Sequence, residues 1–120
     1  MTAFSMSIPR RWAAAWMIRI LAWWGIIRLR SSGVTPDDLS LMIPHQANIR
    51  IIQAAAQRLG IDMEKAVITL DRYGNTSSSS IPLAFYDARS NGRIKPGEYA
   101  LMTGFGAGMT WASAIVRWSR

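Results

Sequence analysis

The order of hydrophobic and polar positions divides the chain into short elements. A short, mostly apolar run at 39–43 predicts a buried strand. Apolar residues then recur on one face from 48 to 59, which predicts a helix that ends at Gly60. The run AVITL at 66–70 is rich in β-branched residues and is bounded by charged ones, so it predicts a second strand.

The second half of the chain continues this alternation. A polar loop at 71–80 ends in four serines, which can cap a helix over 81–90. A further loop at 91–98 leads to two apolar strands, at 99–105 and 109–118, joined through the sequence GFGAG. The predicted order is β-α-β-α-β-β, which is an α/β pattern.

The first 32 residues follow a different pattern. Bulky apolar side chains recur there at helical spacing and predict a helix: Trp12, Trp16, Ile20, Trp23 and Ile27. Residues 1–32 hold five arginines and no acidic residue, although the whole chain has a net charge of only +7. The sequence SSGVTPDD at 31–38 has the composition of a linker. We therefore expect an atypical Trp- and Arg-rich helical segment at 1–32 and an α/β unit at 33–120.

The Trp- and Arg-rich segment allows several interpretations. Its apolar stretch of sixteen residues contains Arg19, so it is too short and too charged for a confident transmembrane span. A signal peptide lacks its A-x-A-like site here. The segment could be an interfacial membrane helix, a core helix of a truncated protein, or a translated stretch without a selected fold. Because the remaining charge is nearly balanced, we expect no nucleic-acid partner, and a membrane is the less favoured partner.

Composition limits the chemistry further. The chain contains no cysteine and a single histidine, which excludes disulfides, thiolate metal sites and a cysteine nucleophile within these residues. We expect no metal ion and no cofactor. The sequence GFGAG lacks the G-x-G-x-x-G spacing and precedes a strand, so it does not predict a dinucleotide site.

Two polar residues are candidates for the chemistry. His45 follows the first predicted strand, where a neutral imidazole could donate a hydrogen bond to a developing oxyanion, although a structural histidine is the more common case. Asn75 follows the next predicted strand and could supply a second donor, or could simply form a turn. If the two strands are parallel neighbours, both loops lie at one edge of the sheet. A serine nucleophile is disfavoured, because no G-x-S-x-G elbow is present.

Three stretches together resemble a known family: PHQAN, LDRYGNTSSSSIP and GRIKPGEYALMTGFGAGMTWASAIVRW. They are similar to the C-terminal half of the β-ketoacyl-acyl-carrier-protein synthase III family, condensing enzymes with a thiolase-like fold. The resemblance covers about 33–118, and residues 1–32 do not share it. It implies the C-terminal half of a thiolase-like α/β fold, preceded by an atypical helix.

The family uses a Cys-His-Asn triad, and the resemblance implies that His45 and Asn75 are its second and third members. In the family these two residues hold the malonyl thioester and stabilise the enolate that forms as carbon dioxide leaves. Asn48 and Arg50 match positions on the side where substrate enters, near the phosphopantetheine arm and the carrier. The glycine-rich loop that lies against the active site corresponds to Phe105, Gly106, Ala107 and Gly108.

The resemblance implies a cytoplasmic, homodimeric acyltransferase that condenses acyl-CoA with malonyl-acyl-carrier protein to initiate fatty-acid synthesis. The family's nucleophilic cysteine lies in its N-terminal half, which is missing here. We therefore expect a partial enzyme that is inactive alone, with a frameshift or a mistaken start codon as one explanation of residues 1–32. The alternatives are one chain of a split enzyme, and a non-catalytic membrane-surface protein with an interfacial helix.

Overall fold

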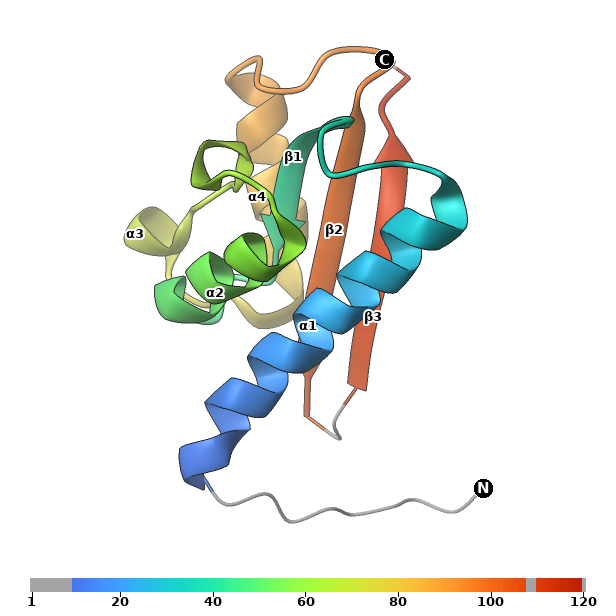
Figure 1. Cartoon of the computed structure of the whole chain (residues 1–120). Coiled ribbons are helices and arrows are strands. Elements are labelled where there is room, and N and C mark those ends of the chain that lie inside the picture. Colours follow the sequence, from blue (N-terminus) through green and yellow to red (C-terminus); the bar gives the residue numbers. More distant parts are fainter. Residues whose placement is uncertain (1–9, 108–109, 120) are drawn as a thin grey trace.

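A three-stranded sheet with helices on both faces forms the structure. The computed structural model describes residues 10–107 and 110–119. Its helices and strands, in chain order, are α1 (Arg10–Ser32), β1 (Leu39–Pro44), α2 (Ile49–Leu59), α3 (Leu70–Tyr73), α4 (Ser80–Ser90), β2 (Tyr99–Gly106) and β3 (Thr110–Arg117). The strand order is β1-β2-β3, with β1 parallel and β3 antiparallel to β2. In Figure 1, α1 and α2 lie in front of the sheet and α4 lies behind it.

Each face of the sheet has its own apolar core. On the side of α1 and α2, Leu39 and Met42 of β1 pack with Leu101 of β2. On the side of α4, Leu41 and Ile43 pack with a second set of buried residues from the neighbouring elements: Val67, Ala84, Ala88, Ile94 and Ala100. Burial on both faces explains why β1 is apolar at most of its positions rather than at alternate ones.

Helix α2 confirms the prediction for 48–59 at both ends. The Asn48 side chain accepts a hydrogen bond from the Arg50 backbone N–H at 2.9 Å, which caps the first turn. Gly60 ends the helix at φ +67°, a conformation that favours glycine, and its N–H bonds back to the last turn. The predicted apolar face is buried, through Ile52, Ala55, Ala56 and Leu59.

The predicted strand at 66–70 is wrong beyond its first residue, so the sheet has three strands rather than four. Ala66 forms a single parallel bridge with Met42, and α3 already begins at Leu70. The Val67 N–H still donates to the Met42 carbonyl, but the groups that follow bond to a side chain: the Gln46 amide donates to the Val67 carbonyl and accepts from the Thr69 N–H. These bonds give the buried backbone groups of this extended segment their hydrogen-bond partners, so pairing with a further strand is not needed there.

Helix α1 is confirmed, but a different face of it packs. Ala22, Gly25 and Leu29 are buried against α2 and the sheet, whereas Trp23 is 64% exposed. The side chains of Trp12, Trp16 and Ile20 lie outside the described part of the chain. Of the described helices, none has the length and apolar character needed to cross a membrane.

Replacing Gly25 by leucine is expected to destabilise the chain by about 2 kcal/mol relative to alanine, the usual cost of overpacking. A Cβ at Gly25 would lie 2.8 Å from Leu59 Cδ2, which marks the close approach of α1 to α2. Alanine needs only a small shift of that side chain, while leucine cannot fit. The two residues have similar helix propensity, so urea denaturation of Gly25→Ala and Gly25→Leu reports packing alone. Equal stabilities would mean that α1 does not pack here.

Candidate active site

His45 lies directly after β1, at the edge of the sheet where the parallel strands end. Its backbone N–H donates to the Thr103 carbonyl of β2 at 2.8 Å, which extends the strand pairing by one residue. The edge of the Phe105 ring meets the imidazole, with 5.4 Å between ring centroids. The backbone and the ring of His45 are thus both held by β2, which limits the orientations that the side chain can adopt.

The second contact of the imidazole comes from α4. Nδ1 of His45 lies 2.6 Å from Oγ of Ser80, the first residue of that helix. Partial burial lowers the pKa of His45 from its ordinary value, because it penalises the charged ring. The N-terminal end of α4 carries a partial positive charge, which opposes protonation in the same direction. At neutral pH, His45 is therefore an uncharged ring that can donate one hydrogen bond.

The titration of His45 is expected to have its midpoint below pH 6.5, the ordinary value for the side chain. The proton then binds more readily to the unfolded chain, so this group lowers stability as the pH falls from about 6.5 through the folded-state pKa. The chain has one histidine, so a single imidazole C2–H resonance reports the titration. A His45→Gln variant should not show this part of the loss of folding stability at acid pH. A midpoint at or above 6.5 would contradict the prediction.

Asn75 lies in the loop between α3 and α4. Its Oδ1 accepts a hydrogen bond from the Ser77 N–H at 2.9 Å, which folds the loop around the side chain. This bond turns the carboxamide so that its NH₂ group is the donor left for another partner. The turn interpretation of Asn75 is thus confirmed, while its predicted role as a donor to an oxyanion stays a prediction.

An ion pair joins the two helices that flank the loop of Asn75. Arg72 of α3 and Asp87 of α4 form two hydrogen bonds of 2.7 Å each. The Arg72 guanidinium lowers the pKa of Asp87, so the pair stays charged at neutral pH. Gly74 precedes the loop at φ +65°, in the region that favours glycine. The position of Asn75 is thus set by its flanking helices.

His45 and Asn75 line the same cavity, although thirty residues separate them in the sequence. The cavity has a volume of about 390 Å³, and Phe105, Gly106 and Ala107 form another part of its wall. Gly108 lies outside the described residues. No acidic side chain lies among the described lining residues. Two uncharged donors in a site without a carboxylate suit the stabilisation of negative charge better than base catalysis.

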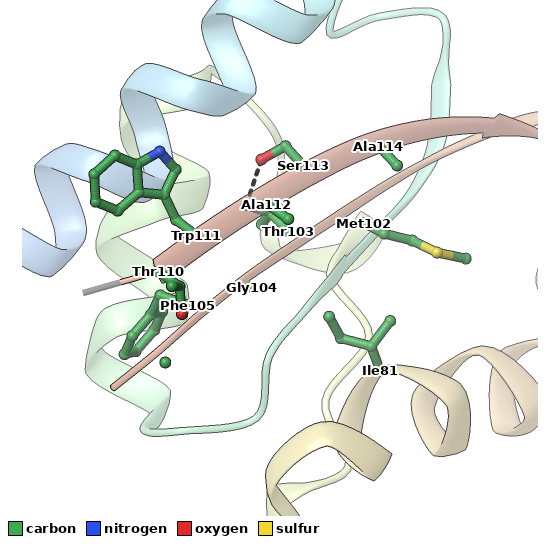
Figure 2. A pocket seen from close by; sticks show the side chains of 11 residues that line it. Ile81, Met102, Thr103, Gly104, Phe105, Thr110, Trp111, Ala112, Ser113 and Ala114 are labelled. Atoms are coloured by element: carbon green, nitrogen blue, oxygen red, sulfur yellow. Dashed lines mark hydrogen bonds between the residues drawn. The ribbon is translucent and has the colours of Figure 1, made fainter. Parts of the chain in front are cut away.

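A second hollow adjoins this cavity along β2 and β3. It has a volume of about 440 Å³ and shares the Gly104–Gly106 stretch and Ile81 with the first. Figure 2 shows β2 and β3 side by side, with Met102 and Ile81 near α4 and Trp111 on the side of α1. Gly104 lies where the two hollows meet, and a Cβ there would lie 3.2 Å from Ile81 Cδ1, so a larger residue would require a small shift of that side chain.

Asn48 and Arg50 lie outside the described wall of the His45 cavity. Asn48 caps α2 and borders a separate surface groove with Ile68 and Asp71. Arg50 is exposed in the first turn of that helix. Their predicted role near a carrier stays a prediction.

Sequence reasoning missed two residues that hold this site. Gln46 is 0% exposed, and its amide bonds to Pro44, Val67 and Thr69, which ties the His45 loop to the segment that leads toward Asn75. Ser80 lies within the serine run, which was interpreted as a helix cap and considered as a source of a nucleophile, but not as a partner of His45. A signal for Gln46 was present, because a large amide in an apolar strand end must find buried partners.

Most of the chain is similar to proteins of one known family. The family model for the C-terminal part of 3-oxoacyl-[acyl-carrier-protein] synthase III matches residues 29–118. The chain belongs to this family. The β-ketoacyl-[acyl-carrier-protein] synthase III of Roseiflexus sp. (strain RS-1) is 49% identical over 102 residues, which are 85% of this chain and 31% of that protein.

Solved structures of 3-oxoacyl-[acyl-carrier-protein] synthase III have the same fold. The enzyme from Thermus thermophilus aligns with a TM-score of 0.88 and 42% identity, over 94% of this chain and 35% of the other. The Aquifex aeolicus structure gives a TM-score of 0.89 and 39% identity, over 93% and 36% of the respective chains. The predicted thiolase-like α/β fold is confirmed, and the chain spans about a third of the length of these relatives.

These synthase III matches extend beyond the stretch that the sequence motifs covered. A match over 102 residues is longer than the segment from 33 to the end of the chain, so it reaches into α1. The similarity therefore includes part of the Trp- and Arg-rich segment. The division of the chain at 33 stays a prediction.

Proposed function

We propose that this chain supplies the His-Asn side of an active site for the decarboxylative condensation of acyl-CoA with malonyl-acyl-carrier protein, the initiating step of fatty-acid synthesis. The observation that carries the proposal is that His45 and Asn75 line the same cavity. Each side chain offers an uncharged hydrogen-bond donor, and no carboxylate lies among the described lining residues. Membership of the synthase III family supports the same reaction class.

The proposed step begins with the malonyl thioester in the cavity. The bond between the malonyl carboxylate and the methylene carbon breaks, carbon dioxide leaves, and the electron pair forms an enolate. The negative charge develops on the thioester oxygen, which accepts hydrogen bonds from the His45 ring and the Asn75 amide. Because both donors are fixed before the reaction, little reorganisation is needed as the charge appears. The enolate carbon then attacks the acyl group of an acyl-cysteine thioester, and the cysteine thiolate leaves.

The cysteine has to come from outside these residues, because the sequence contains none. The proposal therefore includes the remainder of the condensing enzyme as a partner, whether in a longer chain or in a separate one. A homodimeric assembly and a cytoplasmic location belong to the same proposal.

We assign Asn48 and Arg50 to the approach of the carrier. Arg50 is exposed in the first turn of α2, the helix that follows His45, and a guanidinium in that place can form paired hydrogen bonds with a phosphate. Asn48 borders the separate surface groove described above, and its amide oxygen is already used in capping α2. The carrier's phosphopantetheine arm would pass this surface on its way to His45.

The test uses two proteins side by side. The 120-residue chain alone is expected to form no acyl adduct with acetyl-CoA by mass spectrometry and no condensation product with malonyl-acyl-carrier protein. A graft, in which residues 29–118 replace the matched segment of the Thermus thermophilus enzyme, is expected to condense the two substrates. Condensation by the chain alone, or a folded graft that acylates its cysteine but never decarboxylates malonyl thioester, would contradict the proposal.

A further inference from the structure

The contact between Ser80 and His45 determines which nitrogen of the imidazole carries the proton. Ser80 Oγ lies 2.6 Å from His45 Nδ1 and accepts the Gln46 backbone N–H at 3.2 Å. A hydroxyl has one proton to donate. Among the described residues, the Ser80 hydroxyl forms no other hydrogen bond, so Nδ1 is the acceptor available to that proton.

Burial of Ser80 supports a positioning role rather than a nucleophilic one. Its side chain is 1% exposed and does not line the cavity, whereas His45 does. A serine nucleophile has to reach a carbonyl carbon, and its histidine needs an orienting carboxylate. The described cavity wall offers no such carboxylate. Nδ1 faces Ser80, so Nε2 is the nitrogen that His45 leaves for the cavity.

We infer that Ser80 is a positioning residue that fixes His45 as the Nε2–H tautomer, aimed into the cavity that Asn75 shares. The O–H of Ser80 donates to Nδ1, the Gln46 N–H donates to Ser80 Oγ, and the ring proton resides on Nε2. One short segment, 75–80, therefore contributes twice to the site. Asn75 at its start faces the cavity, and Ser80 at its end, the first residue of α4, orients His45. The inference rests on the proposed function only for the use made of the Nε2–H donor.

The single histidine makes this inference directly measurable. In the ¹⁵N-histidine-labelled chain at alkaline pH, long-range ¹H–¹⁵N spectra should show a protonated Nε2 and an unprotonated Nδ1 with the shift of a hydrogen-bond acceptor. Ser80→Ala should lose that acceptor shift, and the ring should divide between two tautomers. Ser80→Thr keeps the hydroxyl and should retain the shift. Ser79→Ala is the matched control, since Ser79 is an exposed neighbour outside the described cavity wall.

In the graft, Ser80→Ala should lower kcat for malonyl decarboxylation about tenfold, the effect of one hydrogen bond of this kind, with KM unchanged and rescue by threonine. A protonated Nδ1 in the unsubstituted chain, or an Nδ1 shift unaltered by Ser80→Ala, would overturn the inference. If Ser80→Ala fails to fold, the unsubstituted chain and Ser80→Thr still decide it. The NMR result does not depend on turnover. Failure of the proposed function would therefore appear separately, as a graft whose rate of malonyl decarboxylation does not change when His45 is replaced.

Discussion

Replacing His45 by alanine in the graft is expected to lower the rate of malonyl decarboxylation by about 10²- to 10³-fold. This is the usual effect of removing one fixed donor from an oxyanion site. The loss should appear in kcat, with the KM for malonyl-acyl-carrier protein little changed, because the hydrogen bond strengthens only as charge develops. Release of carbon dioxide and of condensation product are the two quantities to measure.

A second variant separates hydrogen bonding from ring packing at this position. His45→Gln keeps an uncharged N–H donor and should retain more activity than His45→Ala. Acylation of the graft's cysteine by acyl-CoA should survive in both variants, because that half-reaction does not pass through the enolate. Equal decarboxylation rates in His45→Ala and the unsubstituted graft would remove His45 from the mechanism.

The other large effect is expected at Gln46, on stability rather than on chemistry. Gln46→Met should lower the free energy of unfolding by about 3 kcal/mol, because it leaves several buried backbone groups without partners. The groups affected are the carbonyls of Pro44 and Val67 and the N–H of Thr69, bonded at 2.9 to 3.0 Å. Urea denaturation of the 120-residue chain measures the change.

Gln53→Met is the matched control for this prediction. Gln53 is exposed on α2, so the same substitution there should change stability by less than about 0.5 kcal/mol. A similar small change at Gln46 would show that its hydrogen bonds do not hold the His45 loop to the segment before α3. That loop geometry would then need another cause.

The sequence predicted those parts of the fold whose signals are local. Helix α2 was predicted almost to the residue, because its apolar spacing is regular and Gly60 is a specific signal for its end. The segment at 66–70 was predicted as a strand because its composition is typical of one. Its backbone groups at Val67 and Thr69 bond to the Gln46 side chain, 21 and 23 residues earlier. Such a contact produces no periodic pattern in either segment.

The residues of the candidate site also differ in how far the sequence could predict them. His45 and Asn75 could be predicted, because each follows an apolar segment and each belongs to a motif that resembles the synthase III family. Ser80 could not, since four adjacent serines are equivalent in sequence and only the start of α4 brings one of them to Nδ1. The packing face of α1 was also missed, because small residues at Ala22 and Gly25 allow closer approach than the tryptophans that dominate the pattern.

The most direct test of the account is a crystal structure of the graft with a malonyl thioester analogue that cannot lose carbon dioxide. The account predicts the thioester oxygen within about 3 Å of both His45 Nε2 and Asn75 Nδ2, with Ser80 Oγ on the opposite ring nitrogen. A thioester oxygen that meets neither donor, or an analogue bound outside the cavity that these two residues line, would contradict it.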